Sequence, residues 1–243
     1  MDSIPSIEEI PRGNTCRGVN RFIIECLPTL TRGRADVSLL DLPCGRGEFV
    51  DAVRRFFPHA TVRGGDVRPP VGRPDLAEVD LRRPFTLFAP AKFDVITSIS
   101  GVMEFDNTLQ FLETCRRHLK DDGWLVVSND NIATVRDRWS FLFLGKVRRF
   151  NLLVGPDDPT WKLVPIQNLV RILHEAGFSV VTIRYLSVKP KDWVWTPVAA
   201  LLWPLQWIYL RSRRSSLPVT MRRAMFPFRS LLMRHYVVLC RRA

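Results

Sequence analysis

Two glycines and three acidic residues stand at intervals that could build a ligand-binding site. Asp41 ends an apolar run, and Gly45 and Gly47 follow it with one residue between them. Glycine permits positive φ and close approach of a ligand, and a helix that begins behind the turn offers free N–H groups to a carboxylate. Asp66 follows about 20 residues later, where a carboxylate can hold both hydroxyls of a ribose. Asp80 ends a third segment and could accept a hydrogen bond from the exocyclic amine of adenine.

Two common nucleotide loops do not match this glycine pair. A phosphate-binding P-loop ends in Gly-Lys-Ser/Thr, whereas residues 46–48 read Arg-Gly-Glu. The dinucleotide fingerprint has a third glycine, and Val50 occupies that position. The loop therefore disfavours a dehydrogenase.

The elements that must position these residues alternate between strands and helices. Apolar, β-branched runs bounded by acids and glycines predict strands, and the helical periodicity that begins at residue 50 predicts a helix that packs back on the sheet. The expected strands span residues 37–42, 60–66, 77–81, 93–99, 123–128, 179–186 and 235–241.

In order and spacing, these motifs resemble the class I S-adenosylmethionine-dependent methyltransferases, the seven-stranded, Rossmann-like family. The resemblance covers about residues 35–186 and a last strand at the C-terminus. Its matching segments are Asp41–Phe49, Asp66, Val79–Leu81, Phe93–Ile96 and Val102–Glu104. The chain departs from the family pattern twice: Pro43-Cys44 replaces the usual Gly-Cys or Gly-Thr, and Phe105 stands where a histidine often follows the glutamate.

The resemblance implies an α/β fold: a doubly wound, mostly parallel seven-stranded sheet with an apolar and basic insertion before the last strand. It also implies an enzyme whose cofactor is S-adenosyl-L-methionine. The cofactor-binding residues that it implies are Asp41, Pro43, Cys44, Gly45, Gly47, Phe49, Asp66, Val67, Asp80, Leu81 and Ser98.

Length and composition fit one α/β core with a modest insertion. The chain has 243 residues, of which 46% are apolar, as in globular proteins. We expect an N-terminal helical segment over 1–34, the cofactor-binding core over 35–186, the insertion over 187–234 and the last strand over 235–243. The five cysteines show no metal-binding spacing, and we expect no metal site and reduced thiols in a cytosolic setting. The acidic N-terminus lacks an apolar core, which predicts no signal peptide.

Charge is distributed unevenly along the chain. Residues 1–192 hold 27 Lys and Arg against 24 Asp and Glu, whereas residues 193–243 hold nine arginines and no acid. An uncharged stretch over 193–210 contains four of the seven tryptophans and precedes the first of these arginines. Tryptophan at an apolar boundary followed by arginine is typical of a segment at the headgroups of anionic lipid. A nucleic-acid surface would not need the apolar run, so we expect a membrane partner and no nucleic acid; a buried helix or a dimer interface is the alternative.

Topology favours a segment that lies on the membrane. The strands on either side of the insertion are expected to be antiparallel neighbours, so the insertion must leave and return on one side, and its second half is too charged to cross a bilayer. We expect Pro197 and Pro204 to break the helix, which predicts an in-plane or shallow re-entrant anchor on the cytoplasmic face of a membrane. The predicted membrane contacts are Trp193, Trp195, Trp203, Trp207, Arg211, Arg213 and Arg214.

The acceptor should lie beyond the carboxyl ends of the fourth and fifth strands. Loops that begin at Ser100 and Asn129 follow these strands, so we expect the acceptor to contact Ser100, Asn129, Asn131 and Arg138. The alternative is an ordinary crossover helix capped by Asn129 or Asp130. Transfer to an alcohol needs alignment and a base, for which Asp130 and Glu104 are the candidates, with Asp106 behind them. His118 and His174 lie in helical patterns and are expected at the surface.

The sequence thus leaves different functions open. The first is O-methylation of a lipid-linked or membrane-embedded acceptor, such as a glycolipid, a polyprenyl-linked sugar or a quinone-like compound. The second is a membrane-docked binding subunit that keeps the cofactor fold without chemistry. A methyltransferase for a small molecule, with a hydrophobic dimer interface, is the third.

Overall fold

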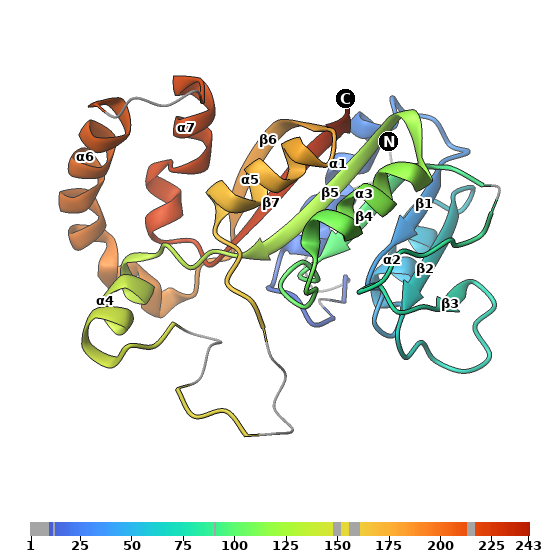
Figure 1. Cartoon of the computed structure of the whole chain (residues 1–243), viewed down its shortest axis with the longest axis horizontal. Helices are drawn as coiled ribbons and strands as arrows, with labels where there is room; N and C mark the ends of the chain where they lie inside the picture. The colour runs from blue at the N-terminus through green and yellow to red at the C-terminus, as the bar shows by residue number, and fades with distance from the viewer. Residues whose placement is uncertain (1–9, 12, 90, 148–151, 156–160, 213–216) are drawn as a thin grey trace.

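Seven strands form a single sheet in the order β3-β2-β1-β4-β5-β7-β6 (Figure 1). The computed structural model describes residues 10–11, 13–89, 91–147, 152–155, 161–212 and 217–243. The strands are β1 (Ser38–Asp41), β2 (Thr61–Asp66), β3 (Leu76–Glu78), β4 (Phe93–Ile99), β5 (Leu119–Asp130), β6 (Phe178–Leu186) and β7 (His235–Arg242). The neighbouring strands β3, β2, β1, β4 and β5 pair in parallel, and β7 is antiparallel to both β5 and β6. The predicted doubly wound, mostly parallel fold is confirmed.

The strand order reverses beside β1, and this reversal locates the site. β1 has β2 on one side and β4 on the other, so the connections on its two sides run in opposite directions across the sheet. In open α/β sheets a crevice forms at such a point, outside the carboxyl ends of the strands. Asp41 and Ile99 are the last residues of β1 and β4.

Helices cover both faces of the sheet, which explains the continuous apolar runs of its strands. The two consecutive residues Leu39 and Leu40 of β1 belong to different hydrophobic clusters, because successive side chains point to opposite faces. The cluster on one face includes residues of α1 (Val19–Leu30) and α2 (Glu48–Phe56), and the other includes residues of α3 (Thr108–His118) and α5 (Ile166–Glu175). Figure 1 shows α3 and α5 on the side of the sheet toward the viewer.

One histidine does not lie where its helical pattern predicted. His118 was expected at the surface, but it is buried. Its Nε2 accepts a hydrogen bond from the Leu87 amide at 3.1 Å, and its Nδ1 lies 2.9 Å from the Thr114 carbonyl oxygen. The reason is non-local, because the segment around residue 87 covers the last turn of α3. His174 is exposed, as expected.

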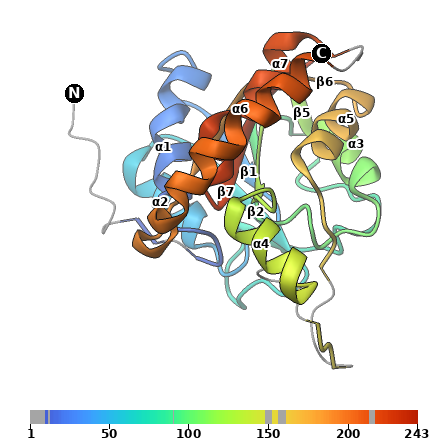
Figure 2. The same ribbon diagram turned by 90° about the vertical axis from the view of Figure 1, so that its left-hand side faces the viewer.

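The described residues of the insertion between β6 and β7 form four helical elements. These are the 3₁₀ helices η1 (Pro190–Trp195) and η2 (Phe228–Leu231), and the α-helices α6 (Thr196–Ser212) and α7 (Val219–Met225). Figure 1 shows α6 and α7 with α4 (Val135–Leu144) at one end of the molecule, and Figure 2 shows this end turned toward the viewer. In the part of the chain that the structure describes, no helix combines the length and the apolarity that crossing a bilayer requires.

The expectation that Pro197 and Pro204 break the helix was wrong. α6 is continuous over 17 residues and contains both prolines. Pro197 lies in the first turn, where the missing N–H has no intrahelical partner to lose. Pro204 is exposed and removes one backbone hydrogen bond, which the rest of the helix tolerates.

A buried ion pair fixes the insertion to the sheet. Both carboxylate oxygens of Asp192 in η1 accept hydrogen bonds from Arg234, the residue before β7, and both side chains are buried. Arg136 of α4 adds a contact at 3.4 Å. Although burial opposes ionisation of Asp192, the hydrogen bonds from Arg234 and the Lys189 amide hold the pKa of this carboxyl below its usual range. The pair ties η1, α4 and the start of β7 together.

We predict that Asp192→Ala lowers the free energy of unfolding by about 3–5 kcal/mol, because it leaves the Arg234 guanidinium buried without its carboxylate. Urea denaturation followed by circular dichroism would measure this loss. The matched control is Glu175→Ala, which removes an exposed partner of Arg171 and should cost less than about 1 kcal/mol. Equal losses in the two variants would contradict the anchoring role of Asp192.

Candidate functional site

A cavity of about 480 Å³ opens at the carboxyl ends of β1 and β4. Its volume is in the range of pockets that bind small molecules and cofactors, about 300–1,000 Å³. Residues from the segment before α1, the β1–α2 turn and the loop after β4 enclose it. The lining residues are Gly13, Asn14, Thr15, Asn20, Asp41, Pro43, Cys44, Gly45, Glu48, Phe49, Asp66, Ile99, Ser100, Glu104 and Trp161.

The two glycines of the β1–α2 turn have different roles. Gly45 adopts φ +55° and lines the cavity, and a Cβ there would meet no atom closer than Glu48 Oε2 at 4.0 Å. Its N–H donates to Asp66 Oδ2 at 2.8 Å, which joins the turn to the end of β2. Gly47 adopts φ +88° as the residue before α2, and a Cβ there would lie 3.0 Å from Leu76 Cδ1. Gly45 thus leaves room for a ligand, whereas Gly47 allows the turn to pack against β3.

Asp41 is a buried carboxyl with an altered acidity. Thr97 donates a hydrogen bond to Asp41 Oδ1 at 2.6 Å, and the exposed fraction of Asp41 is 2%. Burial, aided by the negative charges of Asp66 and Glu48, raises the pKa of Asp41 to about 7, against the opposing effect of the Thr97 hydrogen bond. A nearby cation would favour the ionised form of Asp41 and lower this pKa.

The charge of the cavity fits the cofactor that the resemblance implies. Four carboxyl side chains line it, and its lining residues in the described part of the chain include no Lys, Arg or His. S-adenosylmethionine carries a sulfonium and an ammonium group, so an acidic cavity suits it and repels a pyrophosphate. Asn20 adds a buried Oδ1 without a hydrogen-bond partner among the described residues, an acceptor suited to the ammonium. Asp66 would hold the ribose hydroxyls and Asp41 would face the cationic part.

The structure brings together only part of the predicted cofactor site. Six of the predicted residues line the cavity: Asp41, Pro43, Cys44, Gly45, Phe49 and Asp66. The other five are not among its lining residues. The Asp80 carboxylate accepts from the side chain of Arg82 at 2.9 Å, and Leu81 belongs to the core. Val67 is half exposed, and Ser98 is buried with no hydrogen-bond partner for its Oγ in the described structure.

The predicted acceptor-binding residues and the candidate base Glu104 also separate into two groups. Ser100 and Glu104 line the cavity. Asn129 and Asn131 are buried, and their amides donate to main-chain carbonyl oxygens, those of Val164 for Asn129 and of Ser230 and Met233 for Asn131.

Two further predicted residues lie farther out. Arg138 on α4 donates to the Ala133 carbonyl oxygen and to Gln206 of α6. Asp106 forms an exposed ion pair with Lys162 at 2.6 Å.

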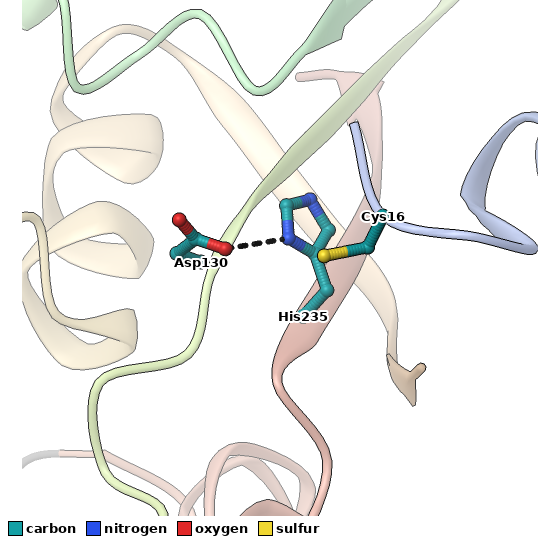
Figure 3. Close-up of side chains that lie close together, drawn as sticks. All are labelled: Cys16, Asp130 and His235. Atoms are coloured by element: carbon teal, nitrogen blue, oxygen red, sulfur yellow. Dashed lines mark hydrogen bonds and ion pairs between the residues drawn. The ribbon is translucent and has the colours of Figure 1, made fainter. Parts of the chain in front are cut away.

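A chain of buried polar groups leads from the cavity wall into the sheet. Ser100 Oγ lies 2.9 Å from Thr15 Oγ1 and 3.3 Å from His235 Nε2. His235 Nδ1 in turn lies 3.1 Å from Asp130 Oδ1, and Figure 3 shows this pair beside Cys16. Burial lowers the pKa of His235, but the hydrogen bond with Asp130 and the contact with Cys16 outweigh it, so this pKa is raised above its usual value. One ligand atom from each of Cys16, Asp130 and His235 lies within 4.8 Å of the others, a spacing at which the three could hold a metal ion.

Sequence reasoning missed several residues of the site. Their positions depend on distant packing: the segment before α1 folds over the ends of the strands, and β7 places its first residue beside the end of β5. The polar pair Asn14-Thr15 before an apolar helix was the available signal for the first of these. The missed residues are Gly13, Asn14, Thr15, Asn20, Glu48, Ile99, Trp161 and His235.

Comparison with known sequences gives two findings. A family model described as a methyltransferase domain matches residues 13–183. The chain is also similar to a ubiquinone biosynthesis O-methyltransferase of Cereibacter sphaeroides, with 26% identity over 176 residues. That match covers 65% of this chain and 66% of the relative, just under two thirds of the relative's length.

Solved structures share the fold at low identity. A SAM-dependent methyltransferase from Archaeoglobus fulgidus has a TM-score of 0.54 at 16% identity, covering 93% of this chain and 95% of that one. Coclaurine N-methyltransferase bound to N-methylheliamine and SAH has a TM-score of 0.54 at 12% identity, covering 94% and 76%. A geranyl diphosphate C-methyltransferase from Streptomyces coelicolor has a TM-score of 0.52 at 14% identity, covering 93% and 80%. The last two are named for methyl transfer to nitrogen and to carbon, so the shared fold leaves the accepting atom open.

We predict that binding of S-adenosylmethionine releases a proton from Asp41 and therefore tightens as pH rises from about 5 to about 7. The sign follows from the raised pKa: at pH 6 the ligand-free carboxyl is mostly protonated, and the cationic ligand prefers its ionised form. Each unit by which the pKa falls on binding contributes about 1.4 kcal/mol. Calorimetry at pH 6 in two buffers of different ionisation enthalpy would measure the released proton.

The control for this prediction is Asp41→Asn, which should remove the proton release. The same linkage predicts that the ligand-free protein loses stability as pH rises from about 4 to about 7, because the folded carboxyl keeps a proton that the unfolded chain has lost. Unchanged proton release in the variant would show that another group titrates.

Proposed function

The chain belongs to the methyltransferase domain family and is an S-adenosylmethionine-dependent methyltransferase, and we propose that it methylates an oxygen of a hydrophobic, membrane-resident phenol of the quinone-precursor kind. The observation that carries this proposal is an exposed apolar surface at the end of the sheet where the cavity opens. The Cereibacter relative is named a ubiquinone biosynthesis O-methyltransferase, and this name supports an oxygen acceptor of the quinone-precursor class.

The apolar surface belongs to α4, η1 and α6. Isolated exposed apolar residues are normal, but a cluster on adjoining elements is typical of a contact surface. α4 contacts η1, and the rings of Trp139 and Trp195 lie 5.6 Å apart. We call these residues the α4–α6 surface: Trp139, Phe141, Leu142, Phe143, Leu144, Trp193, Val194, Leu201, Trp203, Leu205, Ile208 and Tyr209, each more than one third exposed.

Basic residues border this surface. The guanidinium groups of Arg211 and Arg223 lie 5.3 and 5.6 Å from the centre of the Trp207 ring. No acidic residue occurs after residue 192, so the charged residues that α6 and α7 add to the border are all positive. The predicted contacts Arg213 and Arg214 lie outside the described residues.

This composition matches the headgroup region of an anionic bilayer, where tryptophan and arginine concentrate. We therefore assign lipid as the partner of the α4–α6 surface, with the protein lying on the membrane at its cytoplasmic face. A helix in this position can bury its apolar side in the acyl boundary while its ends meet the headgroups.

The surface and the cavity share one edge of the sheet. α4 follows the end of β5, and β5 pairs with β4 so that Ser128 lies opposite Ile99, next to Ser100. An acceptor with an apolar chain can then keep the chain in lipid or along α4 while its polar head enters the cavity. There the chain's own groups would align the acceptor oxygen for an in-line attack on the methyl group that the cofactor supplies.

Methyl transfer to matched acceptors tests the proposed substrate class. The assay would use methyl-labelled S-adenosylmethionine with a catechol that carries a short isoprenoid chain and with the same catechol lacking it, both in liposomes. We expect O-methylated product and a kcat/KM at least about tenfold higher for the chain-bearing acceptor, about 1.4 kcal/mol of added binding. Equal kcat/KM values for the two catechols would reject the quinone-like class. Transfer to a polyprenyl-linked sugar or a glycolipid, tested in the same liposomes, with none to either catechol would also reject it.

Sedimentation with liposomes tests the membrane surface. The triple variant Leu201→Ser, Leu205→Ser and Ile208→Ser removes apolar side chains that are 74%, 65% and 57% exposed, and should bind anionic vesicles at least about tenfold more weakly. Binding of the wild type should fall as salt rises, because each arginine near the surface contributes about 1 kcal/mol.

The matched control for this experiment is Val71→Ser, an exposed apolar residue in the β2–β3 connection, which should sediment like wild type. If the wild type instead stays in the supernatant and forms a dimer that the triple variant lacks, the α4–α6 surface is a protein interface.

A further inference from the structure

Ser100 connects the cavity to the buried histidine. It follows the last residue of β4. Its side chain lines the cavity, although only 8% of the residue is exposed. Its φ of +58° is uncommon for a residue other than glycine. Such backbone strain persists where the surroundings hold it, often at functional sites. Here the Ser100 amide donates to the Ser128 carbonyl oxygen at 3.0 Å and to Ser128 Oγ at 3.1 Å, which fixes the side chain between Thr15 and His235.

His235 is held in one orientation by groups from three elements. Nε2 lies 3.3 Å from both Ser100 Oγ and Ser128 Oγ, and Nδ1 lies 3.1 Å from Asp130 Oδ1. The ring is fully buried, and the titratable groups that face it are Asp130 from β5 and Cys16 from the segment before α1. A carboxylate on Nδ1 favours the tautomer with the proton on Nδ1, which leaves Nε2 free to accept from Ser100.

We propose that Ser100, His235 and Asp130 form a proton relay that removes the proton of the acceptor hydroxyl during methyl transfer, an inference that rests on the proposed O-methylation. The acceptor O–H donates to Ser100 Oγ, while the Ser100 hydroxyl proton passes to His235 Nε2. The acceptor oxygen forms its bond to the methyl carbon as the bond from that carbon to sulfur breaks, and the sulfonium becomes a neutral thioether. The proton ends on His235, and the Asp130 carboxylate stabilises the imidazolium.

Two of the four carboxyl groups of the cavity, those of Glu104 and Asp41, are less suited to this step. Glu104 lines the cavity but is exposed to solvent, so it lacks the buried setting that Ser100 and His235 share. Asp41 is bound by Thr97 and belongs to the cofactor side of the cavity. Asp130 does not line the cavity and acts through the histidine, as a positioning residue. The earlier expectation that Asp130 takes the acceptor proton directly is thereby replaced by a longer path.

Three variants separate a relay from a packing role. Ser100→Gly deletes the hydroxyl and suits the positive φ, and His235→Gln keeps a hydrogen-bonding side chain but cannot take up the proton. Both should lower kcat for a simple catechol about 100-fold or more, with the dissociation constant for S-adenosylmethionine within about threefold of wild type. The matched control is His174→Gln, the same substitution at an exposed histidine of α5 that does not line the cavity, and its kcat should stay within about threefold of wild type. The acidic limb of the wild-type pH profile of kcat should disappear in His235→Gln.

An acceptor that ionises without help provides the decisive comparison. With 4-nitrocatechol, already ionised at the assay pH, the loss in Ser100→Gly and His235→Gln should shrink to about threefold or less. Equal losses for catechol and 4-nitrocatechol would overturn the relay, because a packing role affects both acceptors alike.

A binding measurement distinguishes failure of the relay from failure of the proposed function. The absorbance of 4-nitrocatechol bound in the presence of S-adenosylhomocysteine should show the anion at a pH at least one unit lower in wild type than in Ser100→Gly, even if no methyl is transferred. A wild type that methylates no catechol but passes this titration would refute the proposed reaction and keep the relay. Identical titrations, or no binding of 4-nitrocatechol, would overturn the relay, as would stoichiometric zinc in the purified wild type that Cys16→Ser loses, since Asp130 and His235 would then be metal ligands.

Discussion

The antiparallel position of β7 between β5 and β6 is the constraint on which most of this structure depends. It places His235 directly opposite Asp130 on one side and Leu186 on the other. The insertion therefore leaves the sheet after β6 and returns before β7 at one edge, the same edge at which β5 ends. If β7 were parallel to its neighbours, the end of β6 and the start of β7 would lie at opposite edges of the sheet, one strand length apart. The buried histidine pair and the α4–α6 surface are thus consequences of one pairing.

Electrostatics divides the molecule in two. The whole chain carries a net charge of +12, yet four carboxyl groups line the cavity. Close carboxylates repel one another, and burial adds to this by raising the pKa of Asp41. A cationic cofactor relieves that repulsion, whereas the positive border of the α4–α6 surface attracts an anionic interface. The two ligands in our proposal therefore bind to regions of opposite sign.

The fold could be predicted largely from the sequence, because the features that determine it are local. The glycine turn, the acids at strand ends and the apolar runs predicted all seven strands and the antiparallel pairing of the last two, and β4 has the bounds that were expected. The site was predicted in part, since Asp41, Gly45 and Asp66 come from adjoining turns. The N-terminal segment reaches the cavity, and His235 reaches the back of its wall, through contacts with Ser100 that span more than 80 residues of the sequence. Apart from the polar pair Asn14-Thr15 before α1, no local pattern marks such contacts.

The three polar residues at the end of β5 show why polarity at a strand end does not by itself indicate a ligand. Asn129 and Asn131 hold main-chain carbonyl groups of the segment before α5 and of the insertion, and Asp130 between them holds His235. One tripeptide thus joins the loop, the insertion and the last strand at the acceptor side of the cavity. Buried amides that satisfy main-chain carbonyls rigidify their surroundings, so the wall that carries Ser100 and the elements that carry the α4–α6 surface are fixed to the same strand end. A protein lying on lipid through those helices would hold its cavity at a constant height above the membrane, which is what delivery of a chain-bearing acceptor requires.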